Sequence, residues 1–186
     1  AANKSHFKST DLWFSGGDGT NANSGITSGS IGRLLETYYA NYLNATYPLA
    51  VQVGSSDNSP LFFGDNTRAL SLNLTGQDPS GFYSVVNGLS GQPPSNIPAS
   101  DYGDLLRYII ANDANTQIYA NSISAAFNAG ANSLTYPNTN LSNQLKTVAR
   151  LISGGLESKV YLVRLGNFDT HNVQVVNGST HLGTHA

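Results

Sequence analysis

Histidines close to a carboxylate are the residues of this chain best suited to carry out chemistry. Three of the four histidines, His171, His181 and His185, fall within the last sixteen residues. Asp169 stands two positions before His171, and side chains two apart in an extended segment point to the same side. A carboxylate and an imidazole on one side, joined by a later histidine, suit zinc or iron. Asp169, His171 and His185 are therefore candidate metal ligands.

The same residues also have a purely structural interpretation. An aspartate in a turn commonly accepts hydrogen bonds from the backbone, and the histidine beside it is then exposed to solvent. His6, between Ser5 and Phe7, is a candidate contact to a substrate or to a metal ligand, or else a polar surface residue. No catalytic nucleophile can be named. The chain has no cysteine, and it contains no Gly-x-Ser-x-Gly motif typical of serine esterases.

The segment before Asp169 is the clearest predicted strand. Val160–Leu165 is apolar enough to be buried on both faces, and we expect it to lie parallel to a strand at Leu49–Val53. A helix from the N-cap Asn140 to about Ser153 leads into it through Gly154-Gly155, and its apolar stripe should pack on the sheet. Ligands of open α/β sheets bind beyond the carboxyl ends of strands, which is where Asp169 and His171 follow. The sequence therefore predicts an α/β fold.

The remaining elements are predicted from periodicity and from turn residues. We expect the first thirty residues to be loop-like, with a turn rather than a phosphate-binding loop at Gly16-Gly17-Asp18-Gly19. The other predictions are a helix at 30–43, strands at 61–63 and 70–74, a covering loop at 77–100, and a helix at 101–127 with a break at 112–115.

Composition limits the classes of partner. Only 11% of the 186 residues are charged and the net charge is -2, which argues against electrostatic binding of nucleic acid or anionic lipid. No apolar run approaches the roughly 20 residues of a membrane helix. A charge-poor, polar surface is common on exported proteins that meet glycans or other proteins. The chain has no methionine, even at position 1, so we interpret residues 1–186 as one partial domain, an internal segment of a larger one.

Several ordered motifs resemble the domain of unknown function 1501 family, which belongs to the sulfatase/alkaline-phosphatase superfamily. They are the runs 5–13, 31–35, 48–54, 168–171 (Phe-Asp-Thr-His) and 183–185 (Gly-Thr-His). The chain departs from the family pattern at Lys4, where many relatives have Arg, and at Asn167, where Gly is usual. Ser30 and Ile31 also replace the usual Trp-Leu.

The resemblance implies part of an alkaline-phosphatase-like sandwich with a largely parallel central sheet and flanking helices. It implies an exported (periplasmic, cell-surface or extracellular), metal-dependent hydrolase of phosphate or sulfate esters, using zinc or a similar divalent metal. In that superfamily an early strand supplies a metal-binding Asp and the nucleophile, and a late strand supplies an Asp-His pair. Neither lies in this chain, so Asp169, His171 and His185 would be one part of a divided site.

The partners implied are the remaining segments of the parent protein or other chains of an assembly, and the chain alone is expected to be inactive. The alternative is a non-catalytic surface scaffold, or a component that binds glycans or proteins with the same fold.

Overall fold

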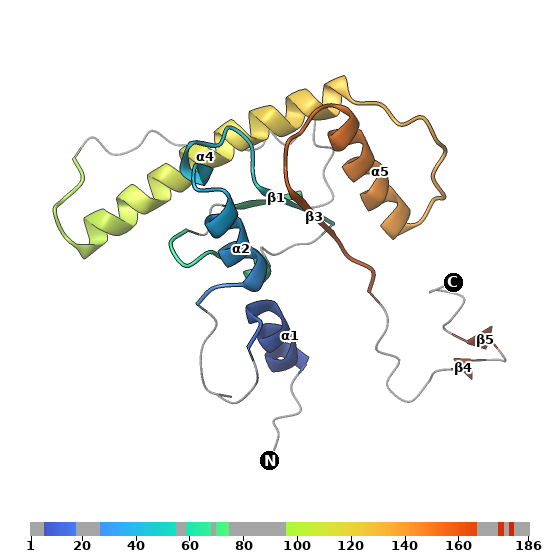
Figure 1. Cartoon of the computed structure of the whole chain (residues 1–186), viewed down its shortest axis with the longest axis horizontal. Coiled ribbons are helices and arrows are strands. Elements are labelled where there is room, and N and C mark those ends of the chain that lie inside the picture. Colours follow the sequence, from blue (N-terminus) through green and yellow to red (C-terminus); the bar gives the residue numbers. More distant parts are fainter. Residues whose placement is uncertain are drawn as a thin grey trace, which may run out of the picture.

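A small parallel sheet is the centre of the molecule. The structure, a computed structural model, describes residues 6–17, 27–54, 59–67, 70–74, 96–166, 175–176 and 179–180. Strands β1 (Ala50–Val53), β2 (Ser71–Leu74) and β3 (Val160–Val163) are all parallel, in the order β2-β1-β3. Helices flank this sheet (Figure 1). The arrangement of mixed helices and parallel strands agrees with the predicted α/β class.

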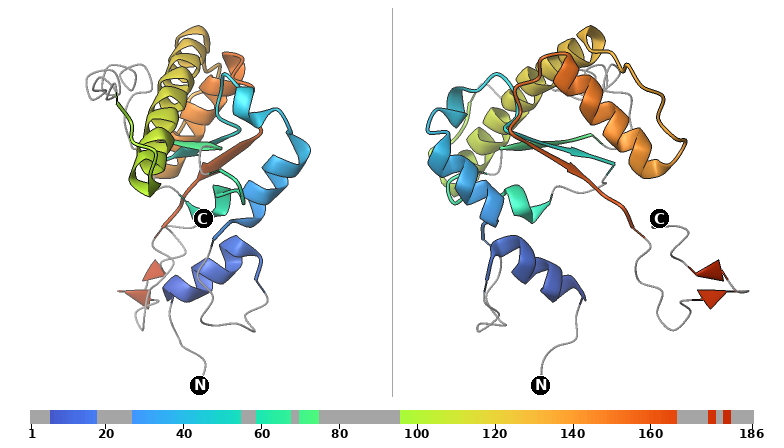
Figure 2. Two further views of the ribbon diagram at one scale, coloured as in Figure 1. Left: turned by 90° about the vertical axis from the view of Figure 1, so that its left-hand side faces the viewer. Right: turned by 45° about the vertical axis from the view of Figure 1, so that its right-hand side comes forward.

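Each face of the sheet has its own apolar core, because strand side chains alternate between the faces. Val51 and Val53 of β1 pack against helices α4 (Asp101–Ala129) and α5 (Asn140–Ser153). Ala50 packs on the opposite face, in a cluster with a residue of α2 (Ser30–Tyr38). Figures 1 and 2 show α4 and α5 on one side of the sheet and α2 on the other. Tyr47, just before β1, contacts both clusters.

Most of the predicted elements are confirmed. Strand β1 lies within the predicted 49–53 segment, β2 within 70–74 and β3 within 160–165, and β1 and β3 are parallel neighbours as expected. Helix α5 packs over the sheet through Leu151, which is completely buried in the cluster that contains Val51. The cap of α5 is Thr139 rather than Asn140, since the Thr139 hydroxyl accepts a hydrogen bond from the Ser142 N–H.

The expectation of a loop-like amino-terminal region is wrong for α1 (His6–Ser15), which is a helix, whereas residues 1–5 and 18–26 lie outside the described residues. The two glycines interpreted as a turn are its carboxyl-terminal cap. Gly16 has a φ of +69°, its N–H donates to the Trp13 carbonyl, and the Gly17 N–H donates to the Leu12 carbonyl. This pair of bonds is a Schellman motif, which ends a helix with a left-handed residue.

The predicted strand at 61–63 is also wrong. The segment is a short 3-10 helix, η2 (Pro60–Phe62), with Phe62 fully buried. Pro60 has a fixed φ suited to a helical turn, and the Ser59 hydroxyl accepts a hydrogen bond from the Leu61 N–H. Apolar residues are thus buried here by a turn rather than by a strand.

The helices differ from the prediction in length. Helix α4 runs through 112–115 without a break, because Asn and Asp cost only a fraction of a kcal/mol in a helix and do not block it as Pro does. Helix α2 ends at Tyr38 rather than near 43, and a 3-10 turn η1 (Tyr42–Asn44) follows. No helix in the described part of the chain is long and apolar enough to cross a membrane.

Strand β3 was expected to be buried on both faces, but all four of its residues are only half-buried. It is an edge strand of the described sheet, so only β1 lies beside it, and no second strand covers its other side. A second, two-stranded antiparallel sheet pairs β4 (Val175–Val176) with β5 (Ser179–Thr180). Of the predicted covering loop at 77–100, residues 77–95 lie outside the described residues.

Candidate functional site

The predicted metal ligands Asp169, His171 and His185 lie outside the described residues. His6 begins α1, but the surroundings of its side chain lie outside the description too. Within the described ranges, no three His, Cys, Asp or Glu side chains come close enough together to hold a metal ion. The structure therefore bears on the candidate site through the elements that lead to it.

The carboxyl ends of β1 and β3 lie side by side and form the edge at which the site is expected. The register pairs Val53 with Val163, so Gly54 and Arg164 both follow at this edge. Asp169 comes five positions after Arg164 in the sequence. The direction in which the chain leaves β3 therefore determines where the predicted ligands begin.

A buried glutamine of α5 holds the chain as it leaves β3. Gln144 is 4% exposed, and its side-chain oxygen accepts a hydrogen bond of 2.7 Å from the Arg164 N–H. Its Nε2 donates to the Arg164 carbonyl at 2.9 Å and to Asn140 Oδ1 at 3.2 Å. The amide thus pairs with both backbone groups of Arg164, as a neighbouring strand would. A buried amide satisfied in this way is well ordered, because breaking one bond leaves an unpaired polar group.

Gly54 makes room for this glutamine at the end of β1. It has a φ of +76°, and a Cβ at this position would lie 2.7 Å from the side-chain amide carbon of Gln144. A side chain would therefore need both a strained backbone and displacement of the glutamine. Gly54, Gln144 and Arg164 are thus in contact at the carboxyl ends of β1 and β3.

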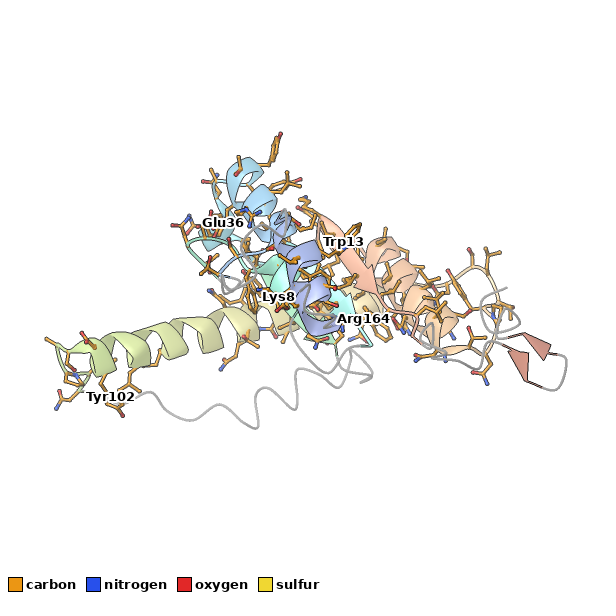
Figure 3. The ribbon with its side chains drawn as sticks, turned by 90° about the horizontal axis from the view of Figure 1, so that it is seen from below. Lys8, Trp13, Glu36, Tyr102 and Arg164 are labelled. Carbon is orange, nitrogen blue, oxygen red and sulfur yellow. The ribbon has the colours of Figure 1, made fainter. Side chains whose placement is uncertain are left out.

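Arg164 gives this edge a positive charge. The residue is exposed, and its guanidinium makes no hydrogen bond or ion pair with any residue in the described ranges. Figure 3 labels Arg164 among the side chains. A guanidinium offers five N–H donors in a plane, an arrangement that matches the oxygens of phosphate and sulfate groups.

A second hydrogen bond, from Tyr161 of β3 itself, ties the strand to the turn that precedes it. The Tyr161 hydroxyl donates to the Leu156 carbonyl at 3.3 Å, and Leu156 is buried in the core cluster on the α5 face. Burial raises the pKa of Tyr161, so its hydroxyl stays protonated at neutral pH and keeps this donor role. The strand before the candidate site is therefore held by the Gln144 side chain of α5 and by the bond from its own Tyr161 to the Leu156 carbonyl.

Gln144 was missed in the sequence, although a signal for it exists. It occupies a position three residues after Leu141 and four before Val148, on the stripe interpreted as the apolar face of the helix. A polar residue at such a position is buried and needs hydrogen-bond partners. Its partner could not be named without the structure, because Arg164 is distant in sequence.

Comparison of the chain with models of known protein families, with curated proteins and with solved structures finds no match.

Proposed function

We propose that this chain is the middle part of an exported, metal-dependent hydrolase of phosphate or sulfate esters with an alkaline-phosphatase-like sandwich fold. In this proposal Asp169, His171 and His185 contribute to a divided metal site, and segments of the parent protein supply the nucleophile and the other ligands. The observation that carries the proposal is the Gln144 amide, which holds the backbone of Arg164 at the carboxyl edge of a parallel sheet. The motif Phe-Asp-Thr-His begins four positions after Arg164 in the sequence.

The donor set and its surroundings fit this chemistry. One carboxylate and two imidazoles are ligands that zinc commonly takes, with room left for a substrate or water. A divalent metal polarises an ester oxygen and stabilises the charge that develops on a transferring phosphoryl or sulfuryl group. Arg164 supports the same assignment, because its exposed guanidinium attracts an anionic ester toward this edge.

The test compares variants of the full-length protein. We expect Asp169→Ala and His171→Ala to lower both the bound metal and the hydrolysis of aryl phosphate or sulfate esters, because each removes a ligand. His181→Ala is the matched control, since it removes a nearby histidine to which the proposal gives no role. Metal content is measured by elemental analysis, and hydrolysis is followed by release of the phenol.

Two results would overturn the proposal. The first is a wild-type protein that binds no divalent metal and hydrolyses neither ester. The second is that Asp169→Ala and His171→Ala retain metal and activity at the level of His181→Ala.

A second candidate is a non-catalytic surface component that binds glycans or proteins. It is favoured by the low share of charged residues, 11%, and by the exposed tyrosines Tyr38, Tyr39 and Tyr102. In that case substitution of Asp169 and His171 leaves ligand binding unchanged.

A further inference from the structure

A hollow lined by tyrosines lies at the amino ends of the strands, opposite the carboxyl ends that Gly54 and Arg164 follow. Its lining residues belong to one continuous segment, 38–49, which joins α2 to the amino end of β1. Lys159, immediately before β3, stands over two of its rings. The hollow has a volume of about 720 Å³, within the range of small-molecule sites. It is distinct from the carboxyl edge, because both strands begin here.

Four tyrosines provide the aromatic part of the lining. Tyr38 and Tyr39 are 75% and 38% exposed, whereas Tyr42 and Tyr47 are half-buried and packed against the core. The inner pair therefore forms a fixed support, and the outer pair presents ring surface to solvent. A tyrosine ring offers a large contact area at a small cost in conformational entropy, since it has only two side-chain torsions.

One cation, the ammonium group of Lys159, lies close to two rings of this cluster. The Lys159 Nζ lies 5.6 Å from the ring centroid of Tyr39 and 5.6 Å from that of Tyr47. The ammonium is thus within cation–π distance of each of the two rings. Glu36, whose charge acts on Tyr42, accepts hydrogen bonds from the backbone N–H groups of Asp65, Asn66 and Thr67. Lys159 makes no ion pair within the described part of the chain, so its ammonium is available as a donor to a ligand.

The polar part of the lining consists of amide and hydroxyl groups. Asn41 and Asn44 are exposed, and neither side chain hydrogen-bonds within the described part of the chain. Each carries both donors and an acceptor, and Thr46 adds a hydroxyl. Burial, followed by the nearby Glu36 carboxylate, raises the pKa of Tyr42, which keeps its hydroxyl protonated.

We infer that this hollow is a glycan-binding site. A sugar ring has C–H groups on its faces and hydroxyls around its edge, so the faces stack on tyrosine rings while the edge meets Asn, Thr and Lys. A nucleic acid needs many cations, whereas the chain has a net charge of -2 and the residues that line the hollow include no Lys or Arg. A proline-rich peptide also packs on aromatic rings, but proline has no N–H, so it would leave the amide acceptors unused.

The experiment measures glycan binding by the full-length protein, first on an array of neutral and acidic oligosaccharides and then by calorimetric titration of the best oligosaccharide. We expect Tyr39→Ala to weaken binding at least about tenfold, because a stacked ring contributes around that factor. Tyr39→Phe should retain most of the binding, since it keeps the ring. Tyr102→Ala is the matched control: Tyr102 is 64% exposed but lies on α4, well apart from Glu36 of α2 in Figure 3.

The outcomes separate this site from the proposed hydrolase. Asp169→Ala should bind the oligosaccharide as wild type does, and Tyr39→Ala should hydrolyse small aryl esters as wild type does, because the proposal puts the two sites at opposite ends of the strands. The inference is overturned if no oligosaccharide binds, if Tyr39→Ala binds as well as Tyr102→Ala, or if a proline-rich peptide binds and the oligosaccharides do not. Far-ultraviolet circular dichroism confirms that each variant is folded.

Discussion

At the scale of single residues, the carboxyl edge of the sheet depends on a glutamine and a glycine that fit each other. The Gln144 side chain makes two hydrogen bonds with the backbone of Arg164. Gly54, which has no side chain, leaves the space that the Gln144 side chain occupies. Neither residue is charged, and neither belongs to a recognisable catalytic motif. Their importance comes from position, because they set the direction of the chain that continues toward Asp169.

Two of the left-handed glycines, Gly54 and Gly155, offer a direct test of this fit. Gly155→Ala should cost about 1–2 kcal/mol of unfolding free energy, because its φ is +86° and a Cβ would meet nothing within 4 Å. Gly54→Ala carries the same backbone strain, and it also drives Gln144 away from Arg164. Each hydrogen bond lost there adds about 1 kcal/mol. Denaturant titration should therefore show a clearly larger loss for Gly54→Ala, and equal losses would contradict the fit described here.

At the scale of elements, the carboxyl-terminal caps of two helices determine where the chain turns. Helices α1 and α5 end in the same Schellman motif, with a left-handed glycine at Gly16 and Gly155. In α5 the motif brings Leu156 back onto Leu151, and both side chains are buried in the core. This contact turns the chain from α5 toward β3, so the cap also positions the strand that precedes the candidate site.

Arg150 and Ser153 of α5 contact the carboxyl end of α4 and the residues that follow it. The Arg150 guanidinium lies 3.9 Å from the centroid of the Phe127 ring, and Nε donates to the Gly130 carbonyl at 3.1 Å. Ser153 adds a hydrogen bond to the Ala131 carbonyl. These contacts hold the two helices that cover one face of the sheet.

Arg150→Lys should lower the free energy of unfolding by about 1 kcal/mol, because lysine keeps the charge but loses the planar stacking and the Nε donor. Lys146→Arg, an exposed change on the same helix, should stay within about 0.5 kcal/mol of wild type. In a double-mutant cycle measured by denaturant unfolding, Arg150→Lys and Phe127→Leu should be non-additive. Strictly additive losses would show that the two side chains act independently.

At the scale of the whole molecule, stability comes from the sheet being covered on both faces. The larger core cluster joins β1 and β2 to α4 and α5, and Tyr119 of α4 lies within it at 5% exposure. Burial raises the pKa of Tyr119 above its usual 10.0. The folded protein therefore holds this proton more tightly than the unfolded chain does.

This difference predicts a loss of stability in alkali. The stabilisation linked to the Tyr119 proton is complete below pH 10.0, the value for the unfolded chain, and falls as the pH rises toward the higher folded value. Tyr119→Phe removes this titration, so its unfolding free energy should fall less steeply above pH 10.0 than that of wild type. Both proteins share their lysines and Tyr161, so the difference isolates Tyr119. Parallel pH profiles would contradict the burial argument.

The local pattern of the sequence was sufficient to predict the three strands of the parallel sheet, the start of α2, α4 and α5, and the parallel pairing of β1 with β3. Period-two and 3.6-residue repeats record which side of each element is buried, and that information is local. Predictions from the pattern were wrong for short segments whose residues are compatible with two different local structures. The apolar 61–63 segment became a 3-10 turn because of Pro60 and Ser59, and Gly16-Gly17 ended a helix instead of opening a loop.

Only the tertiary structure decided the contacts between distant segments. It placed β3 at an edge, half-buried, and it paired Gln144 with Arg164, twenty positions away. It also brought Lys159 over Tyr39 and Tyr47, although Lys159 is more than a hundred positions from either tyrosine in the sequence. The physical reason is that these partners are chosen by the packing of whole elements, whereas periodicity specifies only which face of an element must be covered.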